Sequence, residues 1–222
     1  MAQRMSWEPR MAAGVAAAPL FVVVWFGQAM TRAGFDPVRH PVSLLSLGAL
    51  GWIQIAGFVV TGALVMVFAT GLRDALGSGS GRRAGPILVF LMGVGLVVAG
   101  VFPADAGAGF PPGAPEGAPS PSWHGVLHEI GFVLAQFAWP ATCVVFTRRF
   151  FASGQRRRGA ACLVTSIVAV LVAAIPHADS LGLRLVLASA VELGFLGALA
   201  VHHAGVGGRV PGRTAAGSPA AA

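Results

Sequence analysis

Six long apolar runs, separated by short polar segments, dominate the hydrophobic pattern of this sequence. A helix that crosses a bilayer needs about 20 mostly apolar residues, because lipid offers the backbone no hydrogen-bond partners. The runs approach that length and cover residues 11–30, 51–72, 86–102, 123–146, 159–175 and 183–203. The pattern predicts an all-α, polytopic integral membrane protein built as a bundle of six transmembrane helices. The first run is longer than the apolar part of a typical signal peptide, so we expect it to be retained.

The polar segments divide the chain into an N-terminal segment, 1–10, a six-helix domain, 11–204, and a small polar tail, 205–222, that we expect to be disordered. Two connections inside the domain are long, 31–50 and 103–122. The first contains the apolar stretch from Pro41 to Leu47, which predicts an interfacial or re-entrant helix. The second is dense in Pro, Gly and Ala, which predicts a mobile cover without regular structure.

The composition is too apolar for an ordinary soluble domain, since 55% of the residues are hydrophobic, 10% are charged and the mean hydropathy is +0.76. The net charge of +7 comes from 15 basic residues, all of them Arg, which stand in short clusters between the apolar runs. This arrangement favours membrane lipids over nucleic acid as partners. Cys143 and Cys162 fall inside apolar runs and give no disulfide framework.

The distribution of arginines predicts the orientation, because cytoplasmic loops of membrane proteins retain positive charge. If both termini are cytoplasmic, Arg32, Arg39 and Arg184 lie outside and every other arginine lies inside. Trp52 and Trp123 then fall at the outer ends of two spans, where an indole buries its ring and keeps its N–H hydrated. We therefore expect a multi-pass protein of the cell membrane, with the bacterial plasma membrane as the compartment and both long loops outside.

Polar residues gather at the outer face in this topology, namely His40, His124, His128, His177, Asp36, Asp105 and Asp179. The sharpest unit is the pair His124 and His128, because two histidines at i and i+4 lie on one face of a helix and can bind one cation. A zinc site needs a third protein ligand, which His40, Asp105 or His177 would supply through folding. The alternative is a set of interfacial groups that bind headgroups, water and one another.

Ser43 and Asp105 are the candidate catalytic residues of this face. Ser43 follows His40 by three residues, which permits a serine nucleophile with an imidazole base and is also typical of a helix N-cap. Asp105 ends the third run, where it either serves chemistry or accepts backbone hydrogen bonds in the following turn. Glu129 lies about 100° around the helix from His128 and therefore points to a different face.

Glu192 is the acidic residue deepest inside an apolar run, near mid-bilayer. Arg184 is too far along the same helix for a direct bond, so we expect a partner on another span, such as Gln54 or Gln136, or a proton. A packing hydrogen bond and an ion-relay role are both open for Glu192. Small residues in the third run predict close helix packing there, namely Gly93, Gly95, Ala99 and Gly100.

Four short motifs, at residues 40–48, 102–105, 124–128 and 182–184, together resemble a bacterial and archaeal membrane family catalogued as domain of unknown function 998. The resemblance covers nearly the whole chain and implies a compact multi-helix membrane protein with no established activity. A looser similarity runs to the alkaline ceramidase superfamily, whose members hold zinc with a Ser, an Asp and an H-x-x-x-H pair. That superfamily has seven spans and carries its histidine pair near the C-terminus, unlike this chain.

Three functions follow as hypotheses. The first is a polar pocket at the non-cytoplasmic face that binds a lipid headgroup or a small ligand. The second is a zinc-dependent lipid hydrolase in which His124, His128 and a third residue such as His40 hold the metal, while Asp105 and Ser43 assist the reaction. The third is an ion-coupled transporter that works through Glu192, which the absence of an internal sequence repeat makes the weakest of the three.

Overall fold

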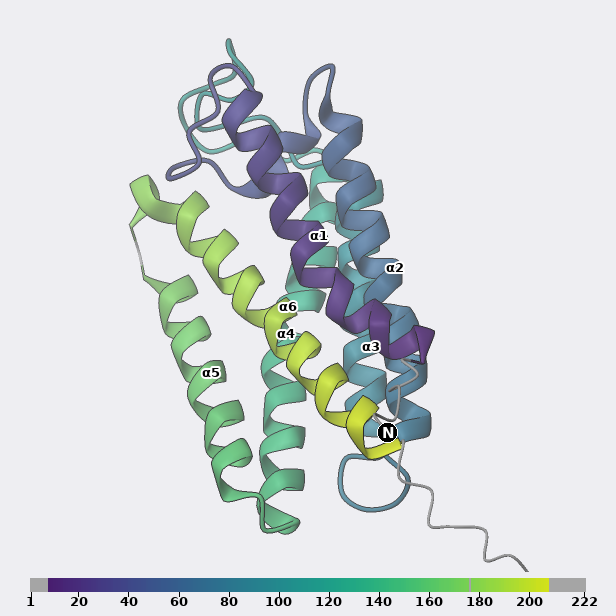
Figure 1. The fold of residues 1–222 in the computed structure, drawn as a ribbon. Helices are drawn as coiled ribbons and strands as arrows, with labels where there is room; N and C mark the ends of the chain where they lie inside the picture. The colour runs from purple at the N-terminus through teal and green to yellow at the C-terminus, as the bar shows by residue number, and fades with distance from the viewer. Residues whose placement is uncertain (1–7, 176, 208–222) are drawn as a thin grey trace, which may run out of the picture.

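Six long α-helices run between two ends of the molecule in the computed structural model, which describes residues 8–175 and 177–207 (Figure 1). They are α1 (Pro9–Thr31), α2 (Gly51–Ala75), α3 (Ala84–Val101), α4 (Trp123–Ala152), α5 (Arg156–Ala174) and α6 (Leu181–Gly207). Two short 3₁₀ helices, η1 (Val42–Ser46) and η2 (Ala178–Ser180), precede α2 and α6. All six long helices have the length and apolar composition needed to cross a membrane, which confirms the predicted all-α class.

Each predicted run coincides with one helix, and several helices continue past the run at the end that carries most of the arginines. Thus α2 continues to Ala75, α4 continues to Ala152 and α5 begins at Arg156. Arginine side chains lengthen these helices at little cost, because their aliphatic stems stay in apolar surroundings while the guanidinium reaches water. The predicted N-terminal segment 1–10 and tail 205–222 lie mostly outside the described residues.

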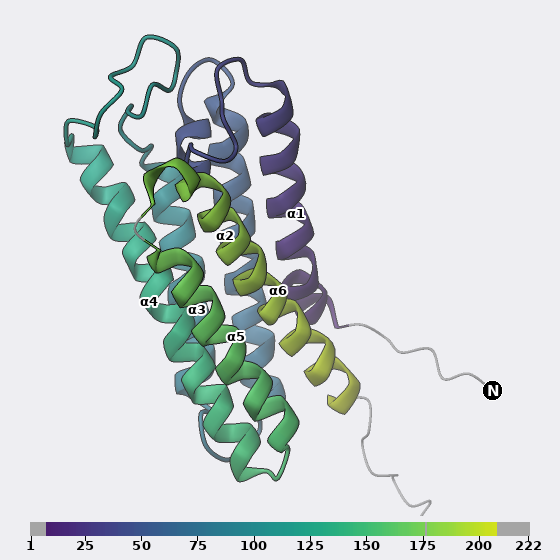
Figure 2. The ribbon, with the colours of Figure 1, turned by 90° about the vertical axis from the view of Figure 1, so that its left-hand side faces the viewer.

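The helices form a closed ring in chain order. Each packs against the next, from α1 to α6, and α6 returns to pack against α1. In Figures 1 and 2, α6 runs obliquely across the bundle, and the α5–α6 turn lies at the same end as the two long loops. We call this end, with the connections before α2, α4 and α6, the loop end. We call the opposite end the terminal end. It holds the α2–α3 and α4–α5 connections, the start of α1 and the end of α6.

Glycines let α2, α3 and α4 approach closely, as the small residues of the third run predict. A Cβ atom at Gly93 of α3 would lie 2.7 Å from the carbonyl oxygen of Gly62 on α2. On the other face of α3, a Cβ at Gly131 of α4 would lie 2.7 Å from the carbonyl oxygen of Gly95. These distances are too short for a side chain, so glycine is required for the observed helix separation.

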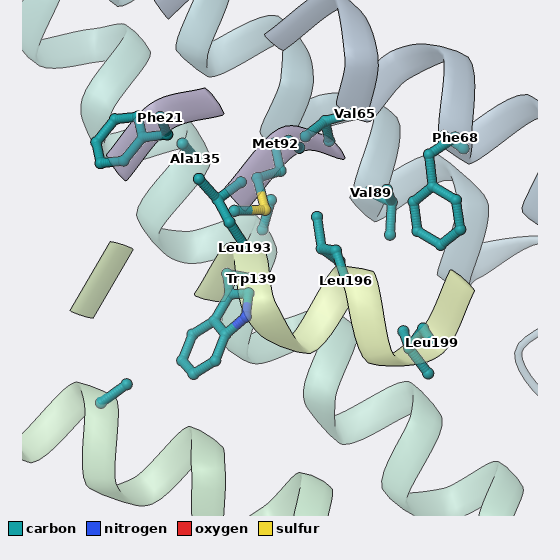
Figure 3. Packing of buried hydrophobic residues seen from close by; sticks show 14 of the residues in the cluster. Phe21, Val65, Phe68, Val89, Met92, Ala135, Trp139, Leu193, Leu196 and Leu199 are labelled. Carbon is teal, nitrogen blue, oxygen red and sulfur yellow. The ribbon is translucent and has the colours of Figure 1, made fainter. Parts of the chain in front are cut away.

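Figure 3 shows the centre of the bundle, where α6 supplies residues to a core shared with α1 to α4. Leu193 and Leu196 of α6 lie among Met92 of α3 and Phe68 of α2, and all four side chains are at most 2% exposed. The outer surface is also apolar, because Val23, Phe137, Leu171 and many similar residues are exposed. An apolar core inside an apolar outer surface is typical of a bundle that faces lipid.

The apolar stretch after Pro41 forms η1, which packs against α1, α2 and α6 at the loop end. Leu44 and Leu45 are buried in the protein, so this short 3₁₀ helix belongs to the bundle itself and is no separate interfacial helix. Among the described residues, the long 103–122 segment contains no helix, as predicted, and an isolated bridge joins Gly107 to Phe110.

Candidate functional site

A pocket of about 1200 Å³ opens at the loop end. Its walls are the segment around Ser43, the 104–121 loop, one face of α4 and the turn that contains η2. In Figure 2, α4 and α5 are joined at the terminal end, and the long loop before α4 rises above the loop end. Loop segments and one face of α4 therefore share the lining of the pocket.

Charged groups line the mouth of this loop-end pocket. Arg39 of the first loop forms a 3.2 Å ion pair with Glu116 of the second, which joins the two loops at the pocket lining. The lining includes three further carboxylates, Asp105, Glu129 and Asp179. Glu129 and Asp179 are exposed to the pocket and have no side-chain partner among the described residues. With one cation and four carboxylates, the pocket lining has an acidic balance.

Besides these charged groups, the pocket is lined by an apolar stripe of α4 that runs past Glu129. Val126, Ile130, Val133 and Phe137 all line it, at the three- and four-residue spacing of one helix face. These side chains are 46–73% exposed, so they form an open wall. From Val126 to Phe137 the stripe is roughly 16 Å long at 1.5 Å per residue. The pocket thus joins a charged end to an extended apolar groove.

Asp105 fixes the start of α4. The Ser122 hydroxyl donates to Asp105 Oδ1 at 2.6 Å and the Ser122 amide donates to Oδ2 at 2.9 Å, while Ser122 Oγ accepts from the Gly125 amide as the N-cap. These bonds from Ser122 hold the pKa of Asp105 below its ordinary value. The carboxylate also packs directly over Gly125, which leaves no room for a Cβ there. Asp105 therefore has the hydrogen-bonding role expected from sequence, but its partner begins the next helix instead of the following turn.

His40 joins the backbones of the two long loops. The Asp36 amide donates to His40 Nδ1 at 2.9 Å, so Nε2 carries the proton and donates to the Ala108 carbonyl at 2.9 Å. The ring also packs against Phe35 and Phe110 at centroid distances of 5.4 and 5.6 Å. Both ring nitrogens are used in these bonds, so His40 has no lone pair free for a metal ion.

His124 and His128 lie on one face of α4, as predicted. His124 Nδ1 donates to the Pro103 carbonyl at 3.0 Å, and His128 Nδ1 donates to the Ala99 carbonyl at 2.8 Å. Both imidazoles therefore hold the end of α3 against α4. Within residues 8–175 and 177–207, no three His, Cys, Asp or Glu side chains are grouped closely enough to hold a metal ion. The expected third ligand is not in place, and no zinc site is formed by His124, His128 and His40.

Ser43 lies inside η1, whose N-cap is Pro41, so the expected N-cap role for Ser43 is wrong. The 3₁₀ helix begins earlier because the Leu44 amide donates to the Pro41 carbonyl. Ser43 borders the loop-end pocket on one side and a small internal cavity of about 60 Å³ on the other. Although Ser43 and Asp105 line the same pocket, Ser122 occupies both carboxylate oxygens of Asp105, which leaves that group poorly placed to act as a general base.

The internal cavity brings His128 of α4 and Glu192 of α6 to a common space. Glu192 is 3% exposed and accepts a hydrogen bond from Gln136 Nε2 at 3.3 Å. Gln136 is one of the two partners expected from sequence, whereas Gln54, the other, accepts from Gln28 of α1. The cavity is large enough for water, so the carboxyl has a polar partner and room for hydration.

Arg184 is buried at the loop end and has no carboxylate partner among the described residues. Its guanidinium donates to the carbonyls of Val172, Ala173 and His177 at 3.4, 3.0 and 2.6 Å. Val172 and Ala173 belong to the last turn of α5, where carbonyls lack helical partners and the helix dipole is negative. Arg184 therefore caps α5 and fixes the α5–α6 turn beside the pocket.

The four motif segments of the sequence meet at the loop end. The amides of Gly182 and Leu183 at the start of α6 donate to the carbonyls of Arg39 and Val38, while the Asp105 and histidine contacts described above join the end of α3 to α4. Sequence reasoning missed Glu116 and the pocket-lining role of Arg39. Glu116 is an acidic residue inside a Pro-, Gly- and Ala-rich stretch of the 103–122 loop, and that isolated charge was the available signal.

A family model described as Protein of unknown function (DUF998) matches residues 15–202, which is most of the chain. No curated protein and no solved structure matches this chain. The matched range contains every residue that lines the loop-end pocket and all four motif segments.

Proposed function

We propose that this chain, which belongs to the family described as Protein of unknown function (DUF998), binds a membrane amphiphile in its loop-end pocket. The observation that carries the proposal is the continuity of the pocket from charged residues at its mouth to the apolar stripe of α4. A lipid matches this arrangement, because it has a polar headgroup at one end and apolar acyl chains at the other. Its headgroup would lie among the loop residues, and one acyl chain would cover Ile130, Val133 and Phe137.

The charges of the mouth favour a headgroup with an ammonium group. Arg39 is paired with Glu116, and the ionised Asp105 carboxylate already accepts hydrogen bonds from Ser122 on both oxygens. Glu129 and Asp179 then supply the free negative charge of the lining. A carboxylate at the edge of lipid is costly unless it is paired or protonated, so a cationic group between these two side chains would stabilise both.

The orientation of the bundle supports a ligand from the outer leaflet. Most arginines belong to the terminal end, whereas Arg32, Arg39 and Arg184 belong to the loop end. Under the positive-inside rule the terminal end is cytoplasmic and the loop end is outside. The protein is then a multi-pass protein of the bacterial plasma membrane whose pocket opens at the non-cytoplasmic face.

Native mass spectrometry of the detergent-purified protein tests this proposal, with added phosphatidylethanolamine as the ammonium-bearing amphiphile. Val133→Trp fills the groove, and Glu129→Gln removes one carboxylate from the mouth. The matched control is Val23→Trp on α1, because Val23 is 68% exposed, is absent from the pocket lining and lies at a similar distance from the loop end.

We expect the wild type and Val23→Trp to retain one phosphatidylethanolamine and Val133→Trp to lose it. Glu129→Gln should weaken binding by about tenfold, since a hydrogen bond to a charged group contributes roughly 1.5–3 kcal/mol. Equal binding by the two tryptophan variants would contradict the proposed pocket. If Glu129→Gln binds the lipid as strongly as the wild type does, the proposed contact between Glu129 and the headgroup is wrong. The proposed acyl-chain groove is unaffected by that result.

A further inference from the structure

A second pocket, at the terminal end, has the opposite charge. It has a volume of about 790 Å³ and lies among the α2–α3 loop, the end of α4, the start of α5 and the end of α6. Arg149, Arg158, His202 and His203 line it, together with serines of the two connections, and no carboxylate lies in the lining that residues 8–175 and 177–207 provide. This arrangement of cationic, imidazole and hydroxyl groups is suited to an anion.

His203 supplies evidence for a missing polar partner. The side chain is 6% exposed, and its Nε2 has no hydrogen-bond partner among the described residues. The ring lies against His202 at a centroid distance of 4.8 Å and against Phe146 at 6.4 Å. A buried ring nitrogen without a partner is unfavourable, so an oxygen atom entering this pocket would stabilise it.

Among the described residues, the two arginines of the pocket also have no acidic partner. Arg149 is held in place by the carbonyls of Leu76, Ser78 and Ser80, at 2.7, 3.2 and 2.9 Å, so its charge is positioned but not neutralised. Arg158 bonds to the neutral side chain of Gln155. An anion placed between the two guanidinium groups would compensate both charges at once.

An apolar groove continues from this basic pocket along α5 and α6. The groove has a volume of about 360 Å³ and shares Phe150, Arg158 and His202 with the pocket. Beyond them its walls are mainly apolar, including Val191 and Leu199 of α6. From His202 to Val191 it follows α6 for roughly 16 Å at 1.5 Å per residue. An inorganic anion would leave this groove unfilled, whereas a lipid with a phosphate headgroup would occupy both parts.

We propose that the terminal end binds the phosphate headgroup of an anionic lipid, with Arg149, Arg158, His202 and His203 around the phosphate and one acyl chain between α5 and α6. The site is independent of the loop-end pocket, because it lies at the opposite end, has the opposite charge and shares no residue with it. Basic pockets between helices at the cytoplasmic side of a membrane are suited to such headgroups.

Native mass spectrometry with phosphatidylglycerol tests the site in the full chain, with inorganic phosphate added in a separate arm. Arg158→Gln removes a pocket charge, and its matched control is Arg157→Gln, the neighbouring exposed arginine that lines neither the pocket nor the groove. Gly194→Leu fills the groove alone, and it should fold because a Cβ at Gly194 meets no atom within 4 Å.

We expect Arg157→Gln to bind phosphatidylglycerol as the wild type does, and Arg158→Gln to bind it about tenfold more weakly. Gly194→Leu should also lose the lipid. Equal losses in Arg157→Gln and Arg158→Gln would show a diffuse attraction to positive charge and overturn the site. The lipid assignment would be overturned by two results together. These are binding of inorganic phosphate to the protein and phosphatidylglycerol binding by Gly194→Leu as strong as that of the wild type.

Discussion

At the scale of single residues, several polar side chains that suggested chemistry hold the loop end together. His40 uses both ring nitrogens to join two loops, and Asp105 uses both oxygens to fix Ser122. The residue types that bind metals and activate nucleophiles are also those that satisfy backbone groups near a membrane surface. The sequence does not distinguish these roles, because the hydrogen-bond partners become known only from the fold. Ala108 is far from His40 in the chain, and Ser122 is far from Asp105.

The Asp105 contact predicts a pH dependence of stability. Because the folded pKa of Asp105 lies below its unfolded value of about 4, the contact stabilises the protein above that pH and is lost as the pH falls through the folded pKa. Asp105→Asn should therefore lower the melting temperature at pH 7 and approach the wild type as the pH falls through the folded pKa of Asp105. Thermal unfolding in detergent at several pH values measures this. A melting difference that stays constant with pH would contradict the role of the ionised carboxylate.

Glu192 gives a second prediction at this scale. Glu192→Gln keeps a polar partner for Gln136, so the free energy of unfolding should change by no more than about 0.6 kcal/mol, the average for such a bond between membrane helices. Glu192→Leu leaves the Gln136 amide without that acceptor and should cost more, about 1–3 kcal/mol. Unfolding of both variants in mixed detergent micelles compares them. A larger loss for Gln than for Leu would show that the carboxyl has another role.

At the scale of helices, the spans could be predicted because a bilayer requires long apolar runs, and all six runs became helices. The glycines of α3 could also be predicted as packing residues, because helices in lipid associate through close contacts between small residues. The η1 segment was harder. Its leucines are as apolar as those of an interfacial helix, and only the packing of α1, α2 and α6 around them decides that they are buried.

Arg184 shows how one side chain completes a helix. Arg184→Met removes the donors to the carbonyls of Val172, Ala173 and His177, so we expect a loss of about 2–4 kcal/mol in the free energy of unfolding. Arg184→Lys should recover part of it, because an ammonium reaches fewer of the carbonyls than a planar guanidinium. Arg156→Met, at the exposed start of α5, is the control. A control as damaging as Arg184→Met would contradict the capping role.

At the scale of the whole molecule, the two ends differ in charge and each carries a pocket. The cluster of outer histidines and acids was predicted from topology, and the structure does collect most of it at the loop end. The pocket itself could not be predicted, because it depends on the 103–122 loop lying over α4 and on the position of the α5–α6 turn. The basic pocket was missed because His202 and His203 only meet Arg149 and Arg158 once α4, α5 and α6 have packed.

The orientation proposed from the arginine distribution predicts which loops can be labelled from outside. In a variant whose buried Cys143 and Cys162 are replaced by serine, a membrane-impermeant maleimide on intact cells should label Ser120→Cys in the loop before α4. Ser80→Cys in the α2–α3 loop should react only after the membrane is permeabilised. The reverse pattern would place the loop-end pocket on the cytoplasmic side.

Photo-crosslinking inside the loop-end pocket tests most directly whether it holds an amphiphile. A benzophenone amino acid is placed at Val133 in the groove, or at Val23 as the control on α1, and the protein is extracted, washed free of bulk lipid and irradiated. Our account predicts a covalent adduct with an ammonium-bearing lipid at Val133 and none at Val23, since only the pocket retains its lipid through washing. No adduct at Val133, or equal adducts at both positions, would contradict it.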